Sequence, residues 1–94
     1  MIKLVYTDAA QGDLVGLYEQ VAGHMGHSAA EVDVQTLLDR CEDLARFPDM
    51  GRRRPDLDNF GLPAQTITQT GRLIVYTKRG DTLYVVRVLK ENAA

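Results

Sequence analysis

The spacing of hydrophobic positions changes along the chain, and each change marks a different kind of element. Apolar side chains occupy every second position from Ile2 to Tyr6, which predicts a short strand at residues 2–6. A helical period of three and four residues follows, in two parts. The first part consists of Leu14, Leu17, Tyr18, Val21 and Met25, and the second, stronger part of Val34, Leu37, Leu38, Cys41, Leu44 and Ala45. The pattern therefore predicts one strand followed by two amphipathic helices.

Polar residues and helix breakers at the borders of these repeats predict where the helices begin and end. Thr7 and Asp8 both offer oxygens that can cap the first helix. Two pairs have the spacing of a capping box, namely Asp8 with Gln11 and Ser28 with Glu31. Gly23 and Gly26 favour the left-handed backbone that ends a helix, and Pro48 excludes helical backbone at the residue before it. Because only a few residues join the two helices, residues 8–47 are expected to form an antiparallel helical hairpin.

The second half of the chain has the composition of a sheet. Residues 51–61 combine glycine, proline and charged side chains, which predicts a loop. From Leu62 onward the chain is rich in Thr, Val, Ile and Tyr, which favour strands. The predicted strands span residues 62–69, 72–78 and 82–89, with turns at Thr70–Gly71 and Gly80–Asp81.

The last predicted strand is apolar on both faces. Strict alternation puts Leu83, Val85 and Leu89 on one face and Tyr84, Val86 and Val88 on the other. This strand is therefore expected to be central in the sheet or covered by a partner on one face. The order β-α-α-β-β-β predicts an α+β fold, in which an N-terminal strand and an α-helical hairpin pack on an antiparallel β-sheet. We expect residues 1–94 to form a single domain.

Composition excludes several classes of protein. The 94 residues are 45% hydrophobic and 26% charged, as in an ordinary globular domain rather than a disordered chain. The single cysteine, Cys41, cannot form an internal disulfide and falls in the apolar stripe of the second helix, so we expect it in the core of a cytoplasmic protein. No apolar run is long enough to span a membrane, and the opening residues do not have the pattern of a signal peptide.

Charge is distributed unevenly between the two halves. Residues 1–51 carry three basic and nine acidic side chains, whereas residues 52–94 carry eight basic and four acidic ones. This gives at most a local basic patch, so direct nucleic-acid binding is not expected. His24 and His27 have no neighbouring ligand set in the sequence, so neither a metal nor another cofactor is expected.

One run of arginines and two single arginines each have two possible interpretations. The run Arg52–Arg53–Arg54 is either a solvated loop or a patch that pairs with carboxylates of another protein. Arg72 begins a strand and is either a surface cation near the turn or a binding residue. Arg87 lies among apolar residues, where it needs a carboxylate or carbonyl partner from a helix unless it contacts another protein.

Four sequence motifs, in this order, resemble those of a toxin family. They are Tyr6–Thr7–Asp8–Ala9–Ala10, the stretch from Leu44 through Phe47–Pro48 and the three arginines to Leu57, Gly71–Arg72–Leu73–Ile74–Val75–Tyr76, and Arg87–Val88–Leu89. Together they cover nearly the whole chain and resemble the ParE branch of the RelE/ParE superfamily of bacterial toxin–antitoxin systems.

The resemblance implies a function and a partner. ParE-type toxins poison DNA gyrase by binding it, so the chain would be a toxin that acts without catalytic residues of its own. A ParD-like antitoxin would neutralise it in a hetero-oligomer, across the helical hairpin and the strands from Arg72 to Leu89. The residues expected to contact the target or the antitoxin are Arg52, Arg53, Arg54, Arg72, Tyr76, Arg87 and Lys90.

Two alternatives remain open at this stage. RelE-type members cleave messenger RNA on the ribosome, and Arg72 matches one of their basic positions. The second strand reads Pro63–Ala64–Gln65–Thr66–Ile67 where that branch carries lysines, and no arginine or aromatic residue follows Leu89. The other alternative is a non-toxic relic that only binds an antitoxin, which the short, nearly uncharged tail and the acidic chain would fit.

Overall fold

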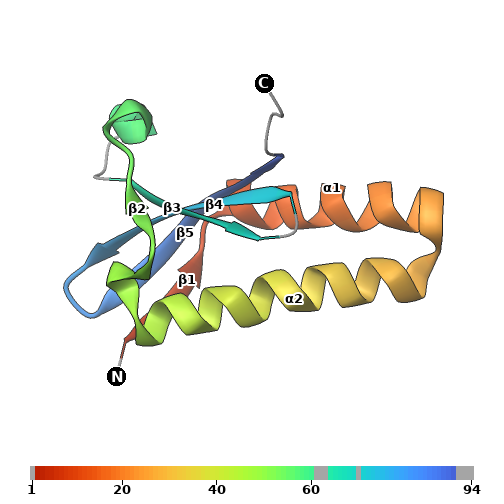
Figure 1. Ribbon diagram of the computed structural model, residues 1–94, viewed down its shortest axis with the longest axis horizontal. Coiled ribbons are helices and arrows are strands. Elements are labelled where there is room, and N and C mark those ends of the chain that lie inside the picture. Colours follow the sequence, from red (N-terminus) through yellow and green to blue (C-terminus); the bar gives the residue numbers. More distant parts are fainter. Residues whose placement is uncertain (1, 61–63, 70, 91–94) are drawn as a thin grey trace.

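The computed structural model describes residues 2–60, 64–69 and 71–90. Its elements are β1 (Lys3–Tyr6), α1 (Asp8–Met25), α2 (His27–Arg46), a 3-10 helix (Pro48–Met50), β2 (Arg52–Arg53), a second 3-10 helix (Pro55–Phe60), β3 (Gln65–Gln69), β4 (Arg72–Arg79) and β5 (Thr82–Lys90). The predicted α+β class, with a strand and a helical hairpin before the sheet-forming half, is confirmed (Figure 1).

The strands form one mixed sheet in the order β1-β5-β4-β3-β2. β1 is parallel to β5, whereas the other neighbours are antiparallel. The two predicted C-terminal strands are confirmed, and β5 lies between β1 and β4. Of the predicted strand 62–69, the described part forms β3, while residues 62 and 63 and Thr70 of the predicted turn lie outside the described residues. The first and last strands of the chain are therefore neighbours in the sheet.

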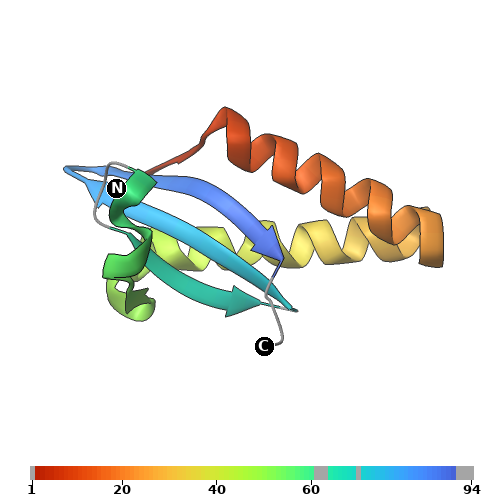
Figure 2. The ribbon, with the colours of Figure 1, turned by 90° about the horizontal axis from the view of Figure 1, so that it is seen from above.

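The helical hairpin packs against the sheet and projects beyond it. α1 and α2 lie antiparallel, and their connected ends extend past the strands (Figures 1 and 2). Met25, expected on the apolar face of the first helix, is 74% exposed because it lies at the far end of this projection. The buried side chains of α1 and α2 instead lie over the sheet, at Ala10, Leu17, Leu37, Cys41 and Leu44.

Of the two predicted N-cap residues of α1, Thr7 is confirmed and Asp8 is wrong, and the predicted cap of α2 at Ser28 is wrong by two residues. Thr7 caps α1, since its side-chain oxygen accepts a hydrogen bond of 3.1 Å from the Ala10 amide. The same hydroxyl donates to the Val86 carbonyl on β5 at 2.7 Å, and this bond fixes Thr7 rather than Asp8 at the cap. α2 begins directly after Gly26, whose φ of 90° suits glycine, so the turn into α2 needs no side-chain cap at Ser28.

The segment predicted as a loop over residues 51–61 contains regular structure. Arg52 and Arg53 form β2, which pairs antiparallel with β3, and a 3-10 helix follows. The turn before β2 is fixed by Tyr76, whose hydroxyl donates to the Pro48 carbonyl at 2.8 Å and accepts from the Gly51 amide at 2.9 Å. A Cβ atom at Gly51 would lie 2.7 Å from the Thr66 carbonyl oxygen, so this position requires glycine for close approach.

A β-bulge in β5 overturns the predicted faces of that strand. Val75 pairs with Arg87 and Tyr76 with Val85, which leaves Val86 as the extra residue. Beyond the bulge the alternation is shifted, so Val88, and not Leu89, joins Leu83 and Val85 in the core. Arg87 consequently lies on the face away from the core, which sequence alternation did not predict.

Candidate partner-binding surfaces

Arg87 is held by a carboxylate of the helical hairpin. Its Nε and one terminal nitrogen donate to the two Asp13 oxygens at 2.8 and 2.9 Å. This is the helix-carboxylate pairing that the sequence left open as one alternative. The hydrogen bonds that Arg87 donates to Asp13 raise the pKa of Arg87. A contact of Arg87 with another protein remains a prediction.

Asp13 also closes an edge of the sheet. It accepts a hydrogen bond of 2.9 Å from the Val88 amide, where β5 extends past the end of β1. Burial by itself raises the pKa of Asp13, but the bonds from Arg87 and Val88 outweigh it, and the pKa lies below its usual value. Together with the Thr7 bond to Val86, this places side chains of the α1 end where a neighbouring strand would otherwise pair.

The run Arg52–Arg53–Arg54 lies at the opposite edge of the sheet. Arg54 forms a fork with Asp56 at 2.9 and 2.7 Å, and Arg53 donates to the Ala64 carbonyl at 3.1 Å. Arg52 is exposed and lines a shallow pocket of about 330 Å³ together with Arg54, Met50, Thr66 and Leu73. Arg52 and Arg54 thus line the same pocket.

The register of the sheet relates the predicted cations on β2 and β5. Arg52 and Arg87 lie on one row of the sheet, since Arg52 pairs with Thr66, Thr66 with Val75 and Val75 with Arg87. At strand spacings of about 4.8 Å, their backbones are about 14 Å apart.

Arg72 and Lys90 form a pair at one end of the sheet. They are register partners on β4 and β5, and Arg72 donates to the Gln20 side chain on α1 at 3.2 Å. The seven predicted site residues therefore do not form one site.

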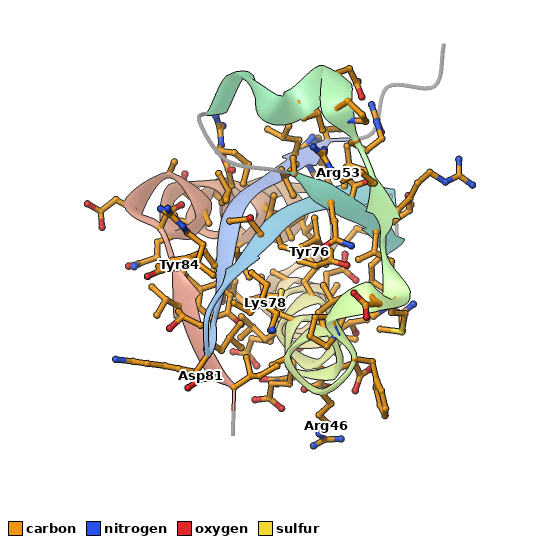
Figure 3. All side chains as sticks on the ribbon, turned by 90° about the vertical axis from the view of Figure 1, so that its left-hand side faces the viewer. Arg46, Arg53, Tyr76, Lys78, Asp81 and Tyr84 are labelled. Carbon is orange, nitrogen blue, oxygen red and sulfur yellow. The ribbon has the colours of Figure 1, made fainter. Side chains whose placement is uncertain are left out.

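Tyr76, also a predicted site residue, is completely buried (Figure 3). Burial raises the pKa of its hydroxyl, which is bonded to the turn before β2. The described structure gives Tyr76 a packing and hydrogen-bonding role, while its contact with a partner stays a prediction.

An apolar groove between β1 and the end of α2 was missed by the sequence analysis. It has a volume of about 690 Å³ and is lined by Ile2, Leu4, Ala45 and Phe47 together with the charged residues Glu42 and Arg46. Phe47 is 63% exposed. The exposure of Phe47 was not predicted because the helical period ends at Ala45. The spacing of Ile2 and Leu4 was visible in the sequence, but it could not show that β1 forms an open edge.

Three further titratable side chains of the described chain lie in structural contacts, namely Cys41, Tyr6 and His27. Cys41 is buried as predicted, and burial raises the pKa of its thiol to about 11. Burial, with Cys41 and Glu42 nearby, also raises the pKa of Tyr6. His27 lies 3.1 Å from the Tyr18 hydroxyl.

The described residues contain neither a cluster of metal ligands nor a helix that could span a membrane. Among residues 2–60, 64–69 and 71–90, no group of three or more His, Cys, Asp or Glu side chains is placed to hold a metal ion. Within that same part of the chain, neither helix has the length and hydropathy needed to cross a bilayer.

The arrangement of strands and helices matches that of solved structures. Nine chains match, and one comes from the chromosomal ParDE toxin–antitoxin system of P. aeruginosa. It is similar to this chain with a TM-score of 0.82 and 21% sequence identity, over 98% of each chain. At this identity the likeness establishes the fold. No curated protein sequence gives a significant match.

The family is established by sequence. The family described as the ParE toxin of the type II toxin–antitoxin system parDE matches residues 4–93. Because the match spans nearly the whole chain, this chain belongs to the ParE toxin family.

Proposed function

We propose that this chain inhibits DNA gyrase by protein–protein contact and is neutralised by a ParD-like antitoxin in a hetero-oligomer. The observation that carries the proposal is the match to the ParE toxin family over residues 4–93. The proposed site of action is the cytoplasm, where gyrase and a newly made antitoxin are both present.

The placement of the polar groups supports a binding role over RNA cleavage. Cleavage in the RelE manner needs cations clustered around a phosphate, with a group that moves protons. In this chain β3 carries no lysine or arginine, Arg87 is neutralised by Asp13, and the Tyr76 hydroxyl is buried and bonded. The proposed role therefore assigns no catalytic residue.

The proposed contacts with gyrase or the antitoxin involve the predicted residues Arg52, Arg53, Arg54, Arg72, Tyr76, Arg87 and Lys90. Arg52 is the best of these to test, because it is exposed and takes part in no ion pair among the described residues. Reversing the charge of an exposed side chain changes its contact with a partner protein but does not unfold the domain.

The function is tested by inducing the chain alone in bacteria that carry a DNA-damage reporter. We expect growth arrest with a strong reporter signal, and inhibition of supercoiling when the purified chain is added to gyrase. Arg52→Glu should weaken both effects, whereas the control Arg79→Glu, at an exposed position outside the predicted site, should not. Arrest with a silent reporter would instead indicate RNA cleavage, and normal growth would indicate a chain that only binds an antitoxin.

A further inference from the structure

The Tyr76 side chain connects the middle of the sheet to the segment that precedes β2. In the sheet β3 lies between β4 and β2, so this side chain, which belongs to β4, extends past β3 to reach that segment. Its hydroxyl donates to the Pro48 carbonyl at 2.8 Å and accepts from the Gly51 amide at 2.9 Å. Pro48 begins the 3-10 helix and Gly51 directly follows it. A single oxygen atom therefore holds both ends of this turn.

The position of β2 depends on few other backbone contacts. β2 is an edge strand of two residues, and it pairs with β3 through Arg52 with Thr66 and Arg53 with Gln65. A pairing this short supplies few of the ladder hydrogen bonds that hold a longer strand in place. After β2, the Arg54 amide donates to the Ala64 carbonyl at 2.9 Å. Before β2, the corresponding support is the Tyr76 hydroxyl.

Arg52 depends on this backbone more than the two arginines that follow it. The Arg53 side chain donates to the Ala64 carbonyl, and Arg54 forms its fork with Asp56. The exposed Arg52 side chain forms no hydrogen bond or ion pair within the described residues. Its direction is therefore set by the backbone that carries it.

The same turn forms one wall of the pocket beside Arg52. Met50, Gly51 and Arg52 are consecutive, and all three line the pocket of about 330 Å³ together with Thr66. A Cβ atom at Gly51 would lie 2.7 Å from the Thr66 carbonyl oxygen and 2.8 Å from Cε1 of Tyr76, so the turn packs directly on the Tyr76 ring. A displacement of this turn would therefore move the pocket wall and Arg52 together.

We infer that Tyr76 is a positioning residue for the contact of Arg52 with the target, because its hydroxyl holds the turn from Pro48 to Gly51 and so fixes the direction of Arg52. This inference rests on the gyrase inhibition proposed above. Tyr76 is completely buried. It therefore acts through Arg52, whereas the sequence analysis expected Tyr76 itself to contact a partner.

A double-mutant cycle with purified full-length chains tests whether Tyr76 acts through Arg52. Tyr76→Phe keeps the ring and removes the hydroxyl, and we expect the concentration for half-inhibition of gyrase supercoiling to rise about fivefold. Arg52→Ala should raise it about tenfold. The double variant should stay near the same value of about tenfold, whereas independent losses would multiply to about fiftyfold. A general loss of folded protein would lower inhibition equally with and without Arg52.

Two further variants serve as control and as second route. Tyr84→Phe is the matched control, because Tyr84 lies on β5, away from β2, and its hydroxyl forms no hydrogen bond within the described part of the chain. Its half-inhibition concentration should stay within about twofold of the unmodified value. Gly51→Ala displaces the same turn without altering the Tyr76 hydroxyl, and we expect the same coupling to Arg52.

Hydrogen exchange of the toxin alone measures the positioning directly. In Tyr76→Phe the Gly51 amide loses its acceptor and should exchange about tenfold faster or more. The Leu37 amide in the middle of α2 reports the stability of the whole domain. The acceleration at Gly51 should exceed that at Leu37, and neither amide should change in Tyr84→Phe.

Three results would overturn the inference and leave gyrase inhibition intact. They are inhibition by Tyr76→Phe as strong as by Tyr84→Phe, a loss that multiplies with that of Arg52→Ala, and a Gly51 amide that exchanges as before. If Arg52→Ala inhibits as strongly as the unmodified chain, Tyr76 has no contact to position and the inference is also wrong. If the unmodified chain does not inhibit gyrase, the proposed function fails and this inference fails with it.

Discussion

Two arginine–aspartate forks of nearly equal geometry occur in different surroundings. Arg87 and Asp13 are joined at 2.8 and 2.9 Å, and Arg54 and Asp56 at 2.9 and 2.7 Å. The first pair links residues 74 apart in sequence, whereas the second links residues two apart. The Asp13 side chain is 16% exposed and that of Asp56 is 60% exposed.

The difference shows that the distance between the charged atoms does not determine what a salt bridge contributes. Asp13 accepts a third hydrogen bond from the Val88 backbone and so joins α1 to the edge of β5. Asp56 holds the Arg54 side chain within one exposed turn, where water competes for both groups. The first pair is part of the tertiary structure, and the second organises a surface segment.

The largest expected effect comes from removing Asp13. Asp13→Ala leaves Arg87 and the Val88 amide without their partner in a half-buried place, which should lower the free energy of unfolding by about 3 kcal/mol. Asp13→Asn, which keeps an acceptor for Val88 but loses the charge, should cost about half as much. Urea unfolding followed by circular dichroism measures both, and equal stability of all three proteins would show that the pair contributes little.

Acidification should produce a smaller, graded effect. Because the pKa of Asp13 is lower in the folded than in the unfolded state, its contribution is complete above the unfolded value of about 3.9 and is lost as pH falls through the folded value. The stability difference between the unmodified protein and Asp13→Asn should thus be constant near neutral pH and shrink below about pH 4. A stability difference that grew on acidification would contradict a lowered pKa of Asp13 in the folded state.

The smallest effect is expected at the exposed fork. Asp56→Ala removes the carboxylate partner of Arg54. Because the pair lies in an exposed turn, water can replace the lost partner, so the urea midpoint should not change measurably. The same substitution releases the Arg54 side chain at the pocket beside Arg52. A clear loss of stability would mean that the exposed fork supports the fold as the Asp13 pair does.

Much of the fold was predictable because it follows from local patterns. The stripe from Val34 to Ala45 specified α2, and the β-rich segments after residue 71 specified β4 and β5. The features that escaped prediction depend on contacts between distant residues. The choice of Thr7 over Asp8 as the cap depends on the bond from Thr7 to Val86. The two-residue strand β2 exists only through pairing with β3, and the bulge at Val86 reverses the faces beyond it.

The candidate site was predictable only in part, for the same reason. The sequence identified Arg87 as a cation that needs a partner, and one of its two interpretations was a carboxylate on a helix. It could not show that Tyr76 is buried against the turn at Gly51, or that Ile2 and Phe47 border one groove. Those two residues are 45 positions apart and meet only because β1 packs beside the end of α2.

The pairing of β1 with β5 also bears on the timing of synthesis. The strand made first has its neighbour in the strand made last, and the bonds from Thr7 to Val86 and from Val88 to Asp13 span 79 and 75 residues. A chain still emerging from the ribosome can form the helical hairpin but cannot close the sheet, since long-range pairing waits for both strands. The complete sheet can therefore form only after β5 has been synthesised.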